Sequence, residues 1–129
     1  MKLTAVSNNP LMQARWADRL DFRFIDGSCR DVLLAARDLC HCGSKLLSHP
    51  LSGSVKPNET PYKSVLLSGR AGITDSASVE LMEKAIITAD KFGPVRRNWQ
   101  ARELEDFQLV DADLIESALE SALTDPLNL

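Results

Sequence analysis

The sequence predicts one α/β domain over residues 1–129, built in three layers, with a small, mainly parallel sheet of about four strands and helices on both faces. Three observations predict this class. The chain of 129 residues is long enough for one hydrophobic core and short for two. Segments with strand-like alternation are followed by segments with helical periodicity. No internal repeat or low-complexity run breaks that order.

The first strand is predicted over residues 3–7, where apolar and small polar side chains alternate. It stops at Asn8-Asn9-Pro10, because asparagine tolerates turn conformations and Pro10 suits the first turn of a helix. A helical stripe follows, and residues 21–25 then alternate with period two. The first quarter of the chain therefore predicts a strand, a helix and a second strand.

A second helix is predicted over about residues 29–42, where apolar side chains recur at helical spacing. Ser28, followed three residues later by Asp31, is a variant of the capping signal at a helix start. Gly43 can take the left-handed conformation that closes a helix.

Two more strands are predicted, over residues 44–48 and 64–68, followed by a helix that Asp75 or a nearby serine can cap and that Gly93-Pro94 ends. The predicted core residues of the strands are Leu3, Ala5, Leu46, Leu47, Val65 and Leu67.

The last part of the chain is acidic. Residues 1–100 carry a net charge of +4, whereas residues 101–129 carry one arginine and eight acids, a net charge of −7. We predict a helical segment at about 100–124, with its amphipathic part starting after Asp111. Such a segment is typical of a solvated helix face, and the alternative is a surface for a basic partner.

The commonest doubly wound arrangement predicts the spatial strand order 2-1-3-4, with the winding reversed between the first and third strands. Ligands in such sheets bind beyond the carboxyl ends of the strands at that point. We therefore expect residues 7–9 and 48–50 to lie side by side, with the loop 50–63 leaving from the same crevice.

The loop over residues 48–64 is the predicted functional surface, since its three prolines restrict its conformation and loops of this length in compact domains are commonly functional or disordered. It offers a histidine that titrates near neutral pH, several hydroxyls, two lysines and a glycine at which a backbone can approach closely. This set suits a small carboxylate or phosphate ligand. The candidate ligand-binding residues are Asn8, Asn9, Ser48, His49, Ser52, Gly53, Ser54, Lys56, Asn58 and Lys63.

A purely structural role is the alternative for the same loop. Ser54, Asn58 and Thr60 could satisfy the loop's own backbone groups, and His49 could orient the turn.

The sequence argues against several other functions. Cys40-His41-Cys42 resembles a metal motif, but neighbours on a helix point in different directions, so no metal site is predicted and Cys29, Cys40 and Cys42 are read as reduced thiols. The Ser-Gly-Ser run at 52–54 lacks the spaced glycines of a phosphate loop, and no cofactor is predicted. No apolar run could span a membrane, no basic and aromatic stripe indicates nucleic acid binding, and we expect a cytoplasmic protein.

Part of the chain resembles the GrdX family, small proteins encoded beside the selenium-dependent glycine, sarcosine and betaine reductases of anaerobic bacteria. The segments that carry the resemblance are Ser-Asn-Asn-Pro at 7–10, Asp-Gly-Ser at 26–28, Pro-Leu-Ser-Gly-Ser at 50–54 and Lys-Pro-Asn-Glu-Thr-Pro-Tyr at 56–62. The resemblance ends near Gly93. It implies a genomic context and possible partners among the reductase subunits, and it transfers no catalytic residue.

Three functions follow as hypotheses. The first is a non-catalytic accessory protein of the reductase system that binds a small anionic ligand or a partner through residues 48–64. The second is a small enzyme that uses His49 as acid or base. The third is an interaction module in which the acidic helix contacts a basic partner.

Overall fold

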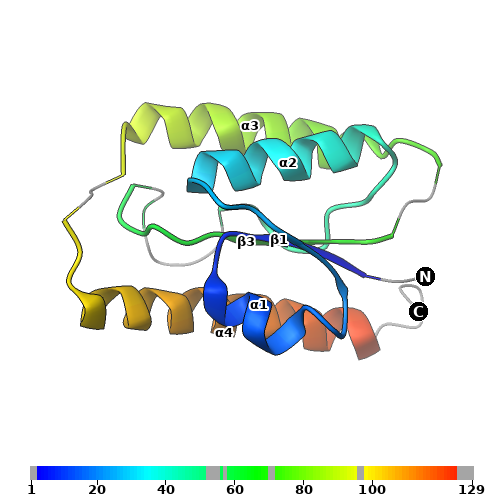
Figure 1. The fold of residues 1–129 in the computed structure, drawn as a ribbon. Helices are drawn as coiled ribbons and strands as arrows, with labels where there is room; N and C mark the ends of the chain where they lie inside the picture. The colour runs from blue at the N-terminus through cyan, green and yellow to red at the C-terminus, as the bar shows by residue number, and fades with distance from the viewer. Residues whose placement is uncertain (1–2, 52–55, 57, 70–71, 96–97, 125–129) are drawn as a thin grey trace.

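The computed structural model describes residues 3–51, 56, 58–69, 72–95 and 98–124. Within them the elements are β1 (Thr4–Ser7), α1 (Pro10–Trp16), β2 (Asp21–Phe24), α2 (Cys29–His41), β3 (Ser64–Leu67), α3 (Ser76–Phe92) and α4 (Ala101–Thr124). They form three layers, with α2 and α3 over one face of the sheet and α1 and α4 over the other (Figure 1). The predicted α/β class, with helices on both faces, is confirmed.

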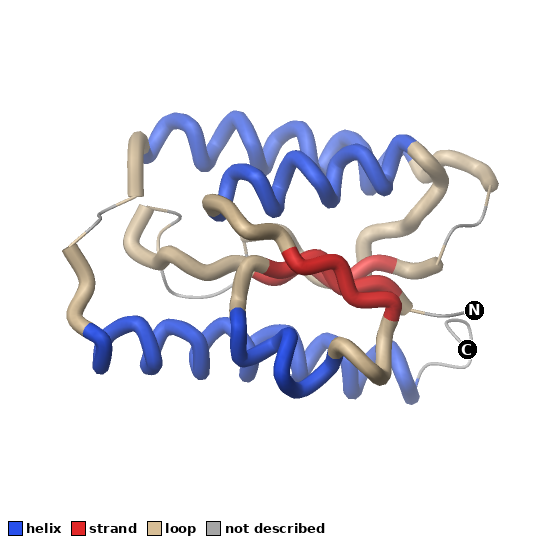
Figure 2. The backbone as a smooth tube through the Cα atoms, viewed as in Figure 1, coloured by secondary structure: helices blue, strands red, loops and turns tan. Residues whose placement is uncertain are grey.

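The sheet of the described residues has three strands in the order β2-β1-β3, between the two helical layers (Figure 2). β1 runs parallel to β2, with Thr4 opposite Asp21, and antiparallel to β3, with Thr4 opposite Leu67. The sheet is therefore mixed, and the prediction of about four mainly parallel strands is not confirmed.

Residues 44–48, predicted as a strand beside the first one, lie on the other side of β3. They form a single antiparallel bridge, from Leu46 to Leu67, and the Leu66 amide donates to Ser48 Oγ at 2.9 Å. This segment runs in the same direction as β1, because both are antiparallel to β3. The predicted order is wrong because β3 occupies the position between them as an antiparallel strand.

The helix ends follow the local signals in the sequence. Ser28 Oγ accepts a hydrogen bond from the Asp31 amide at 3.2 Å, and the Asp31 carboxylate accepts one from the Ser28 amide at 2.9 Å, which completes a capping box at the start of α2. Pro10 is the first residue of α1, and Asp75 caps α3. Gly43 closes α2 with a φ of 105°, a conformation that glycine adopts without strain.

The alternation of β1 and β3 divides the hydrophobic core between the two faces of the sheet. Ala5 and Leu66 pack towards α1 and α4, whereas Val6 and Val65 pack towards α2 and α3. Of the predicted strand core, Leu3, Ala5, Val65 and Leu67 are buried, and Leu46 and Leu47 are partly buried.

A buried polar network joins the end of β1, the start of β3 and the middle of α4. The Asp111 carboxylate, only 7% exposed, accepts hydrogen bonds from Ser64 Oγ at 2.6 Å and from Asn9 Nδ2 at 3.0 Å. The hydroxyls of Ser7 and Ser64 lie 2.7 Å apart, and Ser7 Oγ also accepts from the Asn9 amide. A buried carboxylate needs such partners, because water cannot replace them.

The position of Asp111 corrects a prediction. The sequence predicts that the amphipathic part of the segment at about 100–124 starts after Asp111, whereas Asp111 lies in the middle of α4, which spans Ala101–Thr124. The buried side of α4 includes Ile115 and continues toward the start of the helix through the partly buried Leu104 and Phe107. The polar Asp111 lies on the same side of the helix and interrupts this apolar side because it faces Ser64.

Replacing Asp111 with alanine is expected to lower the free energy of unfolding by about 2–4 kcal/mol, because Ser64 and Asn9 would each lose a buried hydrogen bond to a charged acceptor and a buried gap would remain. Urea unfolding measures this loss. The matched control is Asp113→Ala on the exposed side of α4, where we expect a change within about 0.5 kcal/mol. Equal losses in the two variants would contradict a supporting role for the buried network.

Candidate ligand-binding site

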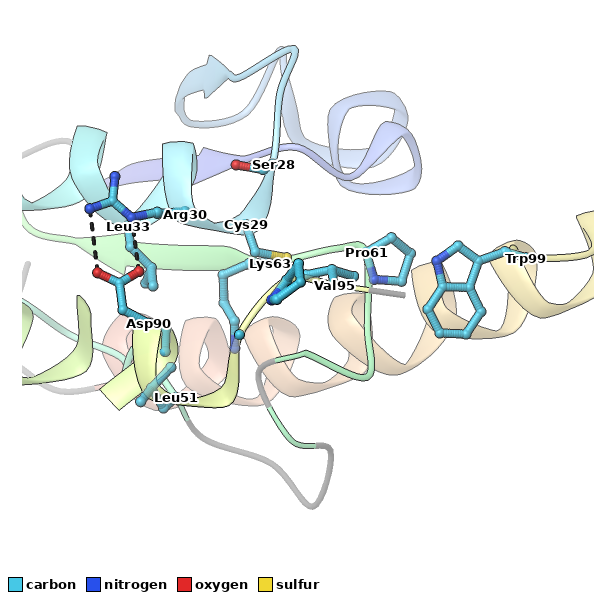
Figure 3. Close-up of a pocket in the computed structure, with 13 residues that line it drawn as sticks. Ser28, Cys29, Arg30, Leu33, Leu51, Pro61, Lys63, Asp90, Val95 and Trp99 are labelled. Carbon is cyan, nitrogen blue, oxygen red and sulfur yellow. Dashed lines mark hydrogen bonds and ion pairs between the residues drawn. The ribbon is translucent and has the colours of Figure 1, made fainter. Parts of the chain in front are cut away.

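A cavity of about 760 Å³ lies between the start of α2, the end of α3, residues 93–95 with Trp99, and the last loop residues before β3 (Figure 3). Its volume is within the range of about 300–1,000 Å³ found for small-molecule sites. Pro61 and Lys63 come from the predicted functional loop, and Leu51 comes from the start of the same loop.

The side chain of Lys63 is the central cation of this cavity. Asn8 holds the backbone of Lys63 through two hydrogen bonds. The side-chain Oδ1 of Asn8 accepts from the Lys63 backbone amide at 2.8 Å, and the backbone amide of Asn8 donates to the Lys63 carbonyl at 3.3 Å. The ammonium forms no hydrogen bond or ion pair with any described residue. Burial lowers the pKa of Lys63, and the charge of Asp111 and the thiol of Cys29 oppose that shift.

Cys29 lies beside Lys63 as the first residue of α2 (Figure 3). Its Sγ donates to the Thr60 carbonyl at 3.5 Å. Burial raises the pKa of the Cys29 thiol to about 11, with Asp111 acting in the same direction and Lys63 against it. The thiol is therefore neutral near pH 7, and it is a poor nucleophile there.

An ion pair lies at the side of the cavity where α2 and α3 meet. Arg30 donates to both carboxylate oxygens of Asp90, at 2.9 and 3.4 Å (Figure 3). Both side chains are about half exposed, so the pair contributes little to stability. The pair does, however, neutralise two of the charges that face the cavity.

The remaining wall is mostly apolar. In Figure 3, Leu33 and Leu51 lie on one side of Lys63, and Pro61 and Trp99 lie on the other. The Trp99 ring packs edge-on against Phe107 of α4, with 4.8 Å between the ring centroids. A cavity of this kind combines one cation with a large apolar surface, a common composition of sites for small organic ligands.

Among the residues predicted for the site, Asn8, Asn9 and Lys63 lie close together at the end of β1. Asn8 Nδ2 also donates to the carbonyls of Gly27 and Pro61, so Asn8 fixes the loop to the start of α2. Asn9 caps α1 and donates to Asp111. Of the three, Lys63 alone lines the cavity.

The other described candidates lie elsewhere. Ser48 is bonded to the Leu66 amide, and His49 is exposed, with its Nδ1 accepting from the Leu51 amide at 3.1 Å. Lys56 is exposed, and Asn58 donates to the Phe92 carbonyl at the end of α3. The expected crevice between residues 7–9 and 48–50 is not formed, because β3 separates them. Ser52, Gly53 and Ser54 lie outside the described residues.

The sequence did not single out Arg30, Asp90 or Trp99, which come from segments far from the loop along the chain. Cys29 was noted as a thiol and not as part of a site. One signal was available: Cys29 and Arg30 directly follow the capping residue Ser28, and helix starts often face ligand sites in α/β folds.

The chain forms a small three-layer α/β protein with a cavity of the size of small-molecule sites, and Lys63 lines this cavity. A family model described as GrdX-like protein matches residues 4–120, and the chain belongs to this GrdX family. The match extends well past Gly93, where the resemblance seen in the sequence ended. Membership points to an association with the glycine reductase system. Neither the curated proteins nor the solved structures contain a significant match to the chain.

Two further findings concern the described residues alone. None of their helices combines the length and apolar content that a bilayer span requires. They also contain no cluster of three or more His, Cys, Asp or Glu side chains that could hold a metal ion. Within the Cys40-His41-Cys42 run, Cys40 is buried in the core and Cys42 is exposed.

The thiols should differ in reactivity. Burial raises the pKa values of Cys29 and Cys40 to about 11, so both stay protonated at about pH 8. We expect Ellman's reagent to react quickly with Cys42 in the native protein and with all three cysteines after denaturation. Cys42→Ser should abolish the fast phase. Two fast thiols in the native protein, or about one zinc or iron per chain by elemental analysis, would contradict this assignment.

Proposed function

We propose that the protein is a non-catalytic accessory protein of the glycine, sarcosine and betaine reductase system, and that it binds a small anionic ligand in the cavity at the end of loop 48–64. The family match supports the association with the reductase system. The observation that carries the ligand proposal is the Lys63 ammonium, which faces the cavity without an ion pair among the described residues.

The chemistry of the cavity supports binding over catalysis. Its thiol is protonated near pH 7, and its carboxylate, Asp90, is committed to Arg30. The described lining residues include no histidine. Neither the protonated thiol nor the paired carboxylate is therefore placed to act as a general base near neutral pH.

His49 supports the enzyme alternative less well. It is exposed, it accepts a hydrogen bond from the Leu51 amide, and it does not line the cavity. Those features support the structural alternative considered for this residue, in which His49 orients the turn that leads to Leu51. Asn58 similarly supports a structural role, because it ties the loop to the end of α3.

The interaction module is a second candidate function, favoured by one observation on α4. Leu109, Val110 and Leu114 are 39–45% exposed among the carboxylates of this acidic helix. Apolar residues within an acidic surface fit a partner whose apolar contact is surrounded by lysine or arginine.

Lys63→Met is expected to weaken the binding of a small carboxylate by roughly 10- to 100-fold, because it removes a charge-assisted hydrogen bond worth about 1.5–3 kcal/mol. Calorimetric titration measures the affinity. Lys63→Arg keeps the charge and should retain most of the binding. Lys56→Met is the matched control on the exposed part of the loop, and it should bind as the wild type does. Equal affinity in Lys63→Met and wild type would refute the proposed site.

The affinity should also depend on pH. Burial lowers the pKa of Lys63 below the ordinary lysine value of 10.5, and only the protonated amine attracts an anion. Because Cys29 keeps its proton up to about pH 11, Lys63 is the first of the two groups to release a proton as the pH rises. The affinity is therefore expected to fall with rising pH below 10.5. In Lys63→Arg the affinity should not fall over this pH range. A wild-type affinity that stays constant up to pH 10.5 would contradict the role of Lys63.

Association with the reductase system is tested by co-purification from a native anaerobe grown on glycine or betaine. A tagged wild-type chain is expected to bring down reductase subunits at low salt. Leu109→Ser combined with Leu114→Ser serves as the α4 variant, with Lys63→Met beside it. Loss of the subunits in the α4 variant alone would favour the interaction module, and their absence with wild type would contradict the accessory role.

A further inference from the structure

We infer that the ligand of this cavity is a monocarboxylate with an apolar or aromatic body, and that phosphate is excluded. This inference rests on the proposed function, since it assumes that the Lys63 cavity binds an anion. It narrows the carboxylate or phosphate expected from the sequence to one chemical class. Three features of the cavity carry it.

The first feature is the charge balance of the lining. Among the described lining residues, the charged side chains are Arg30, Lys63 and Asp90. Arg30 and Asp90 neutralise one another in a two-pronged ion pair, which leaves one positive charge. A monoanion at Lys63 makes the cavity neutral, whereas a phosphate dianion leaves an uncompensated negative charge against an apolar wall, and that is costly.

The second feature is the start of α2, which forms part of the cavity wall. A helix start of this kind would normally offer amide groups to a phosphate. Here the Ser28 amide donates to the Asp31 carboxylate, and the Asp31 amide donates to Ser28 Oγ. The capping box therefore engages two of the amide donors at this helix start and adds the negative charge of Asp31 beside them, which disfavours a second anion there.

The third feature is the apolar surface that faces Lys63. Leu33, Val95 and Trp99 line the same cavity as the ammonium, and Pro61 lies between Lys63 and Trp99 in Figure 3. A carboxylate bound at Lys63 would extend its remaining atoms along this surface. Each methylene buried there adds about 0.8 kcal/mol, or roughly fourfold in affinity.

The same features argue against glycine itself. Its carboxylate could pair with Lys63, but its ammonium would bring a second cation next to the first, and it has no apolar body to bury. The cavity therefore fits an organic acid with an apolar body better than it fits the amino acid.

The test is calorimetric titration of the full chain with phenylacetate, acetate, glycine, inorganic phosphate and the neutral isostere phenylacetamide. Phenylacetate should bind at least about tenfold more tightly than acetate or phosphate, and phenylacetamide and glycine should not bind measurably. Phosphate binding as tight as phenylacetate would overturn the inference while leaving the proposed anion site standing. If none of the anions bound, both the inference and the proposed anion site would be contradicted. Equal binding of phenylacetamide would show an apolar site that needs no anion, and would also contradict both.

Val95→Thr supplies a variant that keeps the shape of the wall and adds a hydroxyl. This variant should bind phenylacetate several-fold more weakly than the wild type does. Its affinity for acetate should be unchanged, because acetate does not reach the apolar wall. Val110→Thr, on the exposed side of α4, is the matched control and should change neither affinity. If Val95→Thr left phenylacetate binding unchanged, the ligand body would not lie on this wall and the inference would fail.

Discussion

The buried carboxylate of Asp111 is the constraint on which the arrangement of this fold depends. It accepts hydrogen bonds from Ser64 at the start of β3 and from Asn9 after β1, and it belongs to α4. Removing any one partner would remove a buried hydrogen bond from the others, so this network holds three distant parts of the chain together. Lys63 precedes Ser64 directly, and its position at the cavity is therefore set by the same network.

Local signals account for the parts of the fold that the sequence predicted well. The capping box of Ser28, the proline at position 10 and the glycine at position 43 act within a few residues, so their effects can be seen in the sequence itself. The insertion of β3 between β1 and residues 44–48 is different. Both apolar segments are short, and β3 is held beside β1 in part by the bond from Ser64 to Asp111 of α4, a contact between distant segments.

The same difference between local and distant contacts explains why only some of the predicted site residues line the cavity. The loop composition pointed to Lys63, which lines the cavity, and also to His49 and Lys56, which do not. Prolines and hydroxyls mark a structured loop, but they do not say which of its cations faces inward. The backbone of Lys63 is held by Asn8 at the end of β1, which is a contact between segments far apart in the sequence, and the Lys63 side chain lines the cavity from that position.

The contacts of Lys63 also show why a lysine there needs a functional explanation. The hydrogen bonds that hold this residue go to its backbone amide and carbonyl, and any residue other than proline could form them. The ammonium adds no hydrogen bond to the described structure, and its burial lowers its pKa, which means that keeping it charged costs free energy at neutral pH. The attraction of Asp111 offsets part of that cost and does not remove it. In the proposed complex a bound carboxylate would supply the missing counter-charge, so the charge of Lys63, which is costly to bury alone, would be the main source of affinity.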